Sequence, residues 1–549
     1  MANPADKPDP NLTTPDEGEV REEELEDIEE EEDYEGEDDN DEATASKPQT
    51  REDAAASRAN AQNLFRLMGV APVPVRVHDV IVKGNEKTKD HVIEAEVDGV
   101  RQATTLQELL EAANVANFNL RALDIFDSVK ITLDAGPPEL PDTTNVVVKV
   151  VESQSPLAAE IVTSTKSQVI VFLNGFVLLS ESMSMMFFVG QARSSTLEGS
   201  LKYKNIFGHG DIWDTSLAYG CDNSGEVGLG LYLPRLRGRP SPFTSRLYLS
   251  TQDWLKFSSY RERALGASLG VLLSKNHELG YTLAWRNLID PTQMASRTIR
   301  RQIGHSLVSD LKYTFKVDER NSSLRPTRGY SFVSTSQIGG LVPDSRTLRF
   351  LRQEFDLKYA VPLGFYRSAL NFGVSGGITF PWGSGYKSRA SSVSERFFLG
   401  GNISPVCSLG GPSALWGFKT RGLGPNEPRR EAEDDKSGDA YERDFVGGDV
   451  AVTAFADLSF DFPLRWFRER GIHGHVFACA GNMAELSGNK YRNFTAPKFM
   501  ETFRSSVGAG IVLPTSLFRM ELNYCHIVKK QEHDRAKSGF FLTFSTPSS

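Results

Sequence analysis

The sequence predicts a mainly β protein: an antiparallel barrel of about sixteen transmembrane strands, preceded by one small α/β domain and a disordered acidic N-terminal tail. Three observations support this fold class. From about residue 156 onward, apolar and polar residues alternate in many short segments. No window is a run of about twenty apolar residues, the length that an ordinary membrane helix needs. The chain also has 46 glycines and 10% aromatic residues, which is typical of all-β proteins, membrane barrels included.

The predicted tail covers residues 1–70. Its segment Asp16–Glu42 contains 19 acidic residues and one arginine, so it carries a charge of −18 within a chain whose net charge is −11. Such a block buries too little apolar surface to fold, and we expect a solvated tail; a partner-docking arm is the alternative. The N-terminus has neither the pattern of a signal peptide nor that of an arginine-rich presequence, so we expect any organelle address to be internal.

The α/β domain is predicted over residues 75–152. Apolar residues recur with a period of two in its strands and at helical spacing in its helices. In chain order, the expected elements are a strand at Val75–Lys83, helices at Thr88–Val97 and Thr105–Leu123, and strands at Val129–Leu133 and Val146–Val151. The edge of the second strand could take up an extended peptide by strand addition, and a purely structural spacer is the alternative.

The barrel is predicted over residues 156–549. In residues 449–462, for example, valine, alanine, leucine and phenylalanine alternate with polar residues that include Asp457 and Asp461. Alternation by itself fits both a soluble sandwich with one wet face and a membrane barrel with a polar lumen. The even count of about sixteen segments favours the barrel. The last segment is the expected closing strand, with Phe540, Phe541, Leu542, Thr543 and Phe544.

A long loop that folds into the barrel is predicted over residues 381–448, and we expect it to carry the function. Long ordered loops between strands are uncommon and usually functional, and glycine permits close backbone approach; a generic glycine-rich turn cluster is the alternative. The candidate motif comprises Gly410, Gly411, Pro412, Trp416, Gly417, Phe418, Lys419, Arg421, Gly422, Gly424 and Pro425.

This motif resembles the sixth loop of the BamA superfamily of barrel-assembly and translocation proteins. The resemblance is closest to the membrane-embedded subunits of the mitochondrial sorting and assembly machinery (SAM), in their plant-like form. It extends from about Val75 to Ser545 and includes Asn321–Gly329 and Arg396–Gly401. It implies that residues 75–152 form a POTRA (polypeptide-transport-associated) domain.

The resemblance implies an insertase of the mitochondrial outer membrane. Unpaired backbone groups in lipid cost several kcal/mol each, so an opened edge between the first and last strands would template the strands of incoming barrel precursors. The implied partners are porin-type and import-pore-type precursors, other SAM subunits, intermembrane-space chaperones and the lipid bilayer, without nucleic acid, cofactor or metal. Two other functions stay open: a chloroplast outer-envelope component for protein translocation or barrel assembly, and a passive channel.

Two features depart from the family pattern. The family loop usually carries R-G-F/Y, whose arginine reaches an acidic residue of a strand, whereas this chain has Trp416-Gly417-Phe418. We expect Lys419 or Arg421 to substitute for that arginine, with Asp457 or Asp461 as partner. Residues 168–191 have no counterpart in the family, and are either a membrane-surface segment or the product of a retained intron.

Enzymatic and metal-binding motifs are weak. Gly373–Gly377 fits G-x-S-x-G but lies within a predicted strand, whereas a nucleophile elbow needs a strand-turn-helix context. His473 and His475 could form a metal pair, yet no third ligand is evident and histidines that face the lumen are the favoured interpretation. The four cysteines are widely separated, which disfavours a zinc site or a disulfide framework. We therefore expect no enzyme.

Overall fold

The computed structural model describes residues 73–545, apart from 141–142, 154–156, 166–169, 174–194, 221–222, 237–240, 344–346, 384–389, 402–403, 413, 431–442, 487–493 and 515–518. The tail expected at residues 1–70 lies outside the described residues, and so does the 168–191 insertion, apart from the backbone of residues 170–173. No helix among the described residues is long and apolar enough to cross a membrane.

The α/β domain has the predicted order β-α-α-β-β. Its elements are β1 (Arg76–Lys83), α2 (Asp90–Arg101), α3 (Leu106–Ala122), β2 (Phe126–Ala135) and β3 (Thr143–Glu152). β3 lies in the middle of the sheet, parallel to β1 and antiparallel to β2, so β1 and β2 are the edges. Apolar residues spaced three or four apart on the helices, such as Ile93 and Val97, pack with Val146 and Val148 of β3 in one buried core.

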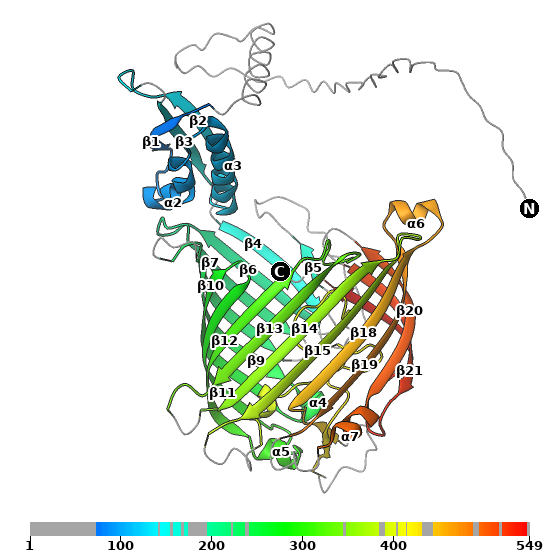
Figure 1. Cartoon of the computed structure of the whole chain (residues 1–549). Coiled ribbons are helices and arrows are strands. Elements are labelled where there is room, and N and C mark those ends of the chain that lie inside the picture. Colours follow the sequence, from blue (N-terminus) through cyan, green and yellow to red (C-terminus); the bar gives the residue numbers. More distant parts are fainter. Residues whose placement is uncertain are drawn as a thin grey trace, which may run out of the picture. The chain divides into compact units, whose positions relative to one another are not determined.

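The second sheet is antiparallel and barrel-like (Figure 1). Each strand pairs with the next along the chain, so the connections are hairpins. The described strands in this consecutive series are β4 (Leu157–Thr165), β6 (Ser195–Lys204), β7 (Ile212–Gly220), β8 (Gly225–Leu233), β9 (Phe243–Asp253), β10 (Arg261–Ser274), β11 (His277–Ile289), β12 (Gly304–Asp318), β13 (Gly329–Gly339), β14 (Phe350–Pro362), β15 (Ala369–Pro381), β18 (Val450–Asp461), β19 (His473–Ala484), β20 (Arg504–Pro514), β21 (Arg519–Lys529) and β22 (Gly539–Ser545).

The strand order brings the last strand, β22, next to the first, β4. β4 pairs with β6 along one edge. Over Ile161–Ser164 its other edge pairs with the short strand β5 (Ile170–Leu173), which belongs to the 168–191 insertion.

Connections at the two ends of the barrel differ. Because consecutive strands are antiparallel, the end at which β4 begins also holds the β12–β13, β14–β15 and β18–β19 connections, the last of which contains α6 (Arg465–Glu469). The opposite end holds connections that contain α4 (Leu255–Ser258), α5 (Arg297–Arg300) and α7 (Ala496–Glu501), and it holds the longest connection, between β15 and β18. Short turns at one end and long loops at the other are typical of transmembrane barrels.

Burial decides between a soluble sandwich and a membrane barrel. Large apolar side chains on alternate strand positions, such as Phe372, Leu522 and Tyr524, are exposed on the outer surface. Charged side chains at the intervening positions, such as Asp457 and Arg519, are buried inside. A soluble sandwich would bury the apolar set instead, so the sheet has the polarity of a transmembrane barrel, as predicted.

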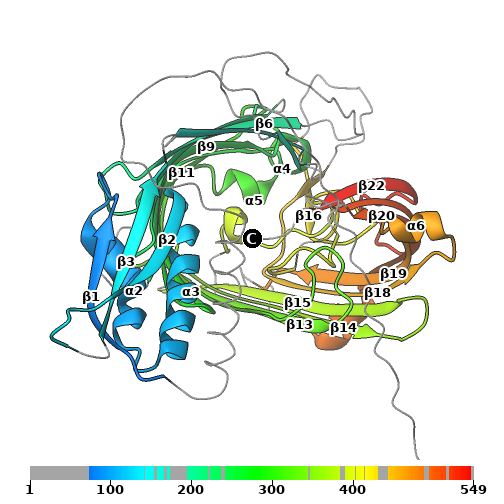
Figure 2. The ribbon, with the colours of Figure 1, turned by 90° about the horizontal axis from the view of Figure 1, so that it is seen from above.

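The connection between β15 and β18 folds into the interior. It contains η1 (Val393–Glu395), β16 (Asn426–Pro428) and β17 (Arg443–Phe445), and the last two pair with each other. Viewed from above, β16 lies inside the curve of the sheet (Figure 2).

Candidate functional site: the inward loop and its seat

The inward loop has an apolar core of its own on the inner wall, by which we mean the inward-facing side chains of the strands. Phe397, Leu399, Leu415, Trp416 and Phe418 of the loop are all buried. They form one cluster with inward residues of three strands: Ala451 and Phe455 of β18, Phe477, Cys479 and Met483 of β19, and Cys525 of β21. Hydrophobic burial therefore holds the loop against the β18–β21 side of the wall.

The centre of this contact is Trp416-Gly417. The Trp416 ring lies 4.1 Å from the ring of Phe477 and edge-on to His475 at 6.0 Å, centroid to centroid. The Ser506 hydroxyl of β20 donates to the Trp416 carbonyl oxygen at 2.6 Å. Gly417 has φ of 87°, and a Cβ there would lie 2.8 Å from Cys525 Sγ. Both the conformation and the close approach to β21 therefore require glycine.

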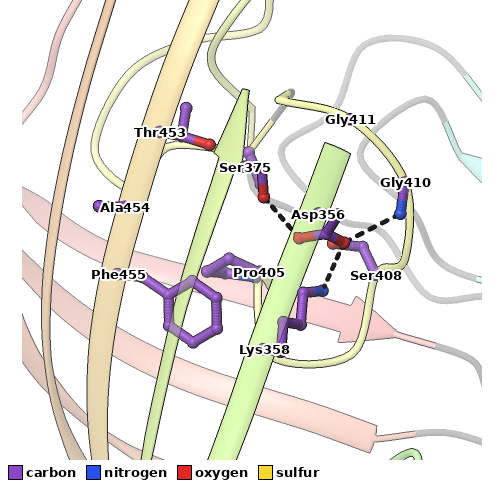
Figure 3. Close-up of a pocket in the computed structure, with 11 residues that line it drawn as sticks. Asp356, Lys358, Ser375, Pro405, Ser408, Gly410, Gly411, Thr453, Ala454 and Phe455 are labelled. Carbon is purple, nitrogen blue, oxygen red and sulfur yellow. Dashed lines mark hydrogen bonds and ion pairs between the residues drawn. The ribbon is translucent and has the colours of Figure 1, made fainter. Parts of the chain in front are cut away.

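A second contact joins the loop to β14 (Figure 3). The buried carboxylate of Asp356 accepts a hydrogen bond from the Gly410 backbone N–H at 3.0 Å and another from the Ser375 hydroxyl of β15 at 2.6 Å. Lys358 Nζ lies 3.5 Å from the same carboxylate. Asp356 thus binds the loop through a main-chain group, while two wall side chains hold the carboxylate in place.

A third contact uses Arg421. Its guanidinium carbon lies 3.4 Å from the ring centroid of Trp254 and 3.8 Å from that of Phe398. It also donates to the Tyr260 hydroxyl at 2.9 Å. Burial raises the pKa of Tyr260, so the hydroxyl stays neutral. Arg421 is therefore bound by aromatic faces and a phenol rather than by a carboxylate.

The wall beneath Trp416 carries its own buried charge network. His475 Nδ1 lies 2.7 Å from Asp457 Oδ1, and His475 Nε2 lies 2.6 Å from Asn523 Oδ1. Asn523 donates to Glu521 at 2.8 Å, and the Glu521 carboxylate pairs with Arg519 at 2.7 Å. Both imidazole nitrogens face oxygen atoms, an arrangement that a protonated imidazole satisfies. All of these side chains come from β18, β19 and β21.

The β12–β13 turn enters the interior from the other side. Arg325 of this turn pairs with Asp461, and Arg519 donates to the Leu324 carbonyl oxygen at 2.7 Å. The Cys407 thiol of the loop points at the same carbonyl oxygen, at 3.7 Å. Burial raises the pKa of Cys407. Loop, turn and wall therefore meet at Leu324.

The closing strand is short. β22 has seven residues, fewer than any other described strand of the consecutive series. On β22, Phe540 and Leu542 are exposed and Thr543 is buried; Phe541 is half-buried and packs against the loop cluster. The side chain of Phe544 lies outside the described residues. Few backbone hydrogen bonds can hold so short a strand.

Comparison with known proteins agrees with this architecture. Residues 205–546, more than half of the chain, match the model of the Omp85 superfamily domain. The chain belongs to the Omp85 superfamily. Residues 75–153 match the POTRA model, described as a surface antigen variable number repeat. The predicted superfamily and the predicted POTRA unit are therefore confirmed.

Relatives extend the comparison. The Omp85 chain is 28% identical over 476 residues to the sorting and assembly machinery component 50 homolog B of Xenopus laevis, covering 85% of this chain and 89% of that protein. It is 28% identical over 475 residues to the human sorting and assembly machinery component 50 homolog, covering 85% and 88%. Its fold is similar to BamA from Haemophilus ducreyi lacking POTRA domains 1–3, with a TM-score of 0.65, 17% identity and coverage of 86% and 84%.

The expected substitute for the missing loop arginine is not the pairing in the structure. Asp457 pairs with His475 and Asp461 with Arg325, rather than with Lys419 or Arg421. Lys419 is exposed, and its backbone N–H donates to the Arg535 carbonyl oxygen at 2.9 Å. The expected pairing was therefore wrong, because β19 and the β12–β13 turn supply the partners of these two carboxylates.

The other motif residues contact either the wall or the loop itself. Pro412 is buried, and Gly411 lies against the side chain of Glu354 on β14. The Gly422 N–H donates to the Lys419 carbonyl oxygen, and Gly424 packs against Met483 of β19. The Pro425 carbonyl oxygen accepts from Val446 N–H at 3.0 Å. Prediction of the motif thus identified the segment that contacts the wall, although not the partners.

Sequence reasoning missed the wall side of the site. Asp356 was overlooked, although the alternation of β14 places it on the inner face beside Lys358. His475 was expected to face the lumen rather than to bind a metal, but its place between Asp457 and Asn523 was not predicted. Within the described residues no group of three or more histidine, cysteine or acidic side chains could hold a metal ion. Ser375 of the G-x-S-x-G match lies in mid-strand and binds Asp356.

Proposed function

We propose that this chain inserts β-barrel precursor proteins into the mitochondrial outer membrane by templating their strands at the seam between β22 and β4. The proposal rests on membership of the Omp85 superfamily and on the names of its relatives, which are components of a sorting and assembly machinery. Its partners would be porin-type and import-pore-type precursors, further subunits of that machinery, chaperones that deliver precursors, and the bilayer itself.

One structural observation carries the proposed mechanism. The outer edge of β4, which the strand order brings next to β22, pairs over Ile161–Ser164 with the inserted strand β5. This edge therefore accepts a strand other than β22. A precursor strand that paired in the same way would satisfy its backbone hydrogen bonds while it enters lipid, where each unpaired group costs several kcal/mol. The shortness of β22 supports opening at this seam, because few hydrogen bonds must break.

The α/β domain fits a role in receiving the precursor. β2 is an edge strand of its sheet, so its outer edge is available for pairing with an extended segment. β4 follows this domain directly in the chain, so a segment captured on β2 would be delivered to the end of the barrel at which β4 begins.

The first experiment is import of a porin precursor into mitochondria depleted of this protein, read as assembled oligomer on a native gel. We expect the precursor to cross the general import pore and to stall before it integrates into the membrane. Normal porin assembly together with reduced plastid import or reduced solute flux would overturn the proposal in favour of an envelope component or a channel. Deleting residues 75–152 distinguishes a passive channel from an assembly factor, since a channel would still conduct whereas an assembly factor would lose its handling of precursors.

Templating itself is tested by cross-linking. A cysteine in place of Leu542 on β22 should cross-link, through a bismaleimide, to a cysteine in the last strand of an arrested precursor. A cysteine in place of Ile338 on β13 is the matched control, because it is similarly exposed on the outer face but lies in the middle of the sheet. Equal cross-linking at both positions would argue against a specific seam.

A further inference from the structure

Two neighbouring connections form an exposed patch at the end of the barrel where β4 begins. They are residues 363–367 between β14 and β15, and residues 464–470 between β18 and β19, which include α6 (Figure 1). The backbone N–H of Asp461, the last residue of β18, donates to the Tyr366 carbonyl oxygen at 3.0 Å, so the first connection contacts the end of the strand from which the second begins. We call residues 363–367 and 464–470 the rim patch.

The rim patch is rich in exposed apolar side chains. The exposed fractions are 56% for Phe365, 66% for Tyr366, 61% for Leu464 and 52% for Trp466. A soluble surface rarely gathers four such side chains in two adjoining turns, so the patch is a candidate contact surface.

Aromatic stacking connects the patch to the lipid-facing surface of the barrel. Phe460 lies on the outer face of β18, and Phe462 follows directly after the last residue of this strand; the two alternate with the buried Ser459 and Asp461. Ring contacts run from Phe460 to Phe462 at 6.0 Å, then to Phe467 at 5.3 Å and to Trp466 at 4.9 Å. The apolar outer surface therefore continues beyond the end of the strand into α6. Transmembrane barrels carry aromatic side chains at the membrane–water interface, near the ends of their strands.

The charge of the patch is strongly positive. It contains Arg367, Arg465, Arg468 and Arg470 against the single acidic residue Glu469, and all five are exposed. No acidic side chain pairs with any of these guanidinium groups in the part of the chain that the structure describes. Arg470 lies over the Trp466 ring at 4.4 Å, and Arg468 donates to the Pro463 carbonyl oxygen at 3.4 Å. The arginines thus remain available to an anion next to the apolar surface.

Backbone strain supports a role for the turn at residues 363–367. Tyr366 and Arg367 both have positive φ, of 44° and 45°, and Ser368 N–H donates to the Phe365 carbonyl oxygen at 2.7 Å. Two successive residues with positive φ at the centre of a tight hairpin turn strongly favour Asn-Gly. A tyrosine followed by an arginine is unfavourable there. Strained residues of this kind mark sites where the side chain is needed.

We propose that the rim patch binds the headgroups of anionic phospholipids. The aromatic and leucine side chains enter the interface, continuous with the outer surface of β18, and the guanidinium groups bind the lipid phosphates around them. Guanidinium groups match phosphate geometry in a bidentate manner, and arginines at an anionic surface attract its lipids. A lipid occupant is favoured over an acidic protein because the apolar part of the patch is continuous with the lipid-facing surface. Bound lipid would fix the height of the β14–β19 side of the barrel in the membrane.

The test is native mass spectrometry of the full chain released from detergent micelles, with added phosphatidylglycerol or phosphatidylcholine. The variant R465Q/R468Q/R470Q removes three charges from the patch. R297Q/R300Q/R301Q is the matched control, because it removes three exposed arginines at α5, at the opposite end of the barrel. We expect the wild type and the control to prefer phosphatidylglycerol. The patch variant should lose about a hundredfold in affinity for this lipid, since each arginine near an anionic surface contributes about fivefold.

A second readout keeps the test independent of ionisation conditions. In nanodiscs, brominated phosphatidylglycerol should quench the emission of Trp466, which is identified as the part of the tryptophan fluorescence that is lost in Trp466→Phe. R465Q/R468Q/R470Q should reduce this quenching. The proposal is overturned by equal losses in the patch variant and the control, or by a wild type without lipid preference. Displacement of the lipid by millimolar inorganic phosphate would show a free-anion site instead. Unchanged lipid binding with a lost protein partner would reassign the patch to protein docking.

Discussion

The hydrogen bond between Asp356 and the Gly410 N–H can be removed while the other contacts between the loop and the wall stay in place. In Asp356→Ala the loop loses this contact, whereas Ser375 and Lys358 belong to the wall and not to the loop. A hydrogen bond to a charged group contributes about 1.5–3 kcal/mol. Undocking should therefore become about 10- to 150-fold more frequent, since about 1.4 kcal/mol corresponds to a factor of ten.

Cys407 reports this undocking. It lies in the loop three residues before Gly410, it is buried, and burial raises the pKa of its thiol, so its reaction with a maleimide requires the loop to open. We expect the rate of Cys407 labelling, followed by peptide mass spectrometry, to rise by the factor given above in Asp356→Ala. Asp356→Asn should give a smaller increase, because a neutral hydrogen bond contributes about 0.5–1.5 kcal/mol.

Two controls separate docking from general damage. Ser375→Ala removes a bond within the wall and should change Cys407 labelling only slightly. The ammonium of Lys358 loses its carboxylate in Asp356→Ala and gains hydration when the loop opens, which adds to the acceleration; Asp356→Ala combined with Lys358→Met removes that contribution. Equal acceleration in Ser375→Ala and Asp356→Ala, or an unchanged rate in Asp356→Ala, would refute the assignment of Asp356 as the residue that holds Gly410.

Three further predictions concern packing, stacking and pH. Trp416→Ala should lower the free energy of unfolding in urea by about 3–5 kcal/mol, as for other buried aromatic truncations; a loss below 1 kcal/mol would contradict its central place in the cluster. Arg421→Lys keeps the charge but loses the flat stacking surface, and should lower the free energy of unfolding in urea by about 1–2 kcal/mol. An unchanged free energy of unfolding would show that the contact depends on charge alone. The backbone N–H of Thr104 lowers the pKa of Glu108 from its ordinary value of 4.5, followed by the Thr104 hydroxyl. The ionised form therefore stabilises the start of α3 above about pH 4.5, and this contribution is lost as pH falls through the lowered pKa. Hydrogen exchange of the α3 amides should show this loss of stability at low pH in the wild type and not in Glu108→Gln. The same pH dependence in both proteins would refute the role of Glu108.

The alternation of residues predicted the two faces of the barrel because a strand has a fixed side-chain period. Asp457 and Asp461 are four residues apart on β18, and residues separated by an even number lie on the same face of a strand. Both side chains are buried on the inner face. The same rule, applied to β14, would have placed Asp356 and Lys358 inside. Their place in the sheet follows from local geometry, which is the information that a sequence pattern contains.

The partners of these residues could not be predicted in the same way. Whether Asp457 meets Lys419, Arg421 or His475 depends on the path of a loop of almost seventy residues, and that path is set by apolar packing over three strands. The inward carboxylates were predicted, but their partners come from β19 and from the β12–β13 turn. Neither element was part of the motif from which the pairing was inferred.

The replacement of the expected loop arginine by Trp416 changes what holds the loop. An arginine that paired with a wall carboxylate would leave a buried, unpaired charge behind each time the loop moved, which is strongly unfavourable. In this chain Asp457 keeps His475 and Asp461 keeps Arg325, and neither partner belongs to the loop. Undocking of the motif instead exposes the face of an indole and releases hydrogen bonds to main-chain groups, among them Ser506 to Trp416 and Asp356 to Gly410. Movement of the motif therefore separates no ion pair with β18. The ion pairs between the loop and the wall lie outside the motif, at Glu395, which pairs with Arg286 of β11 and Arg352 of β14.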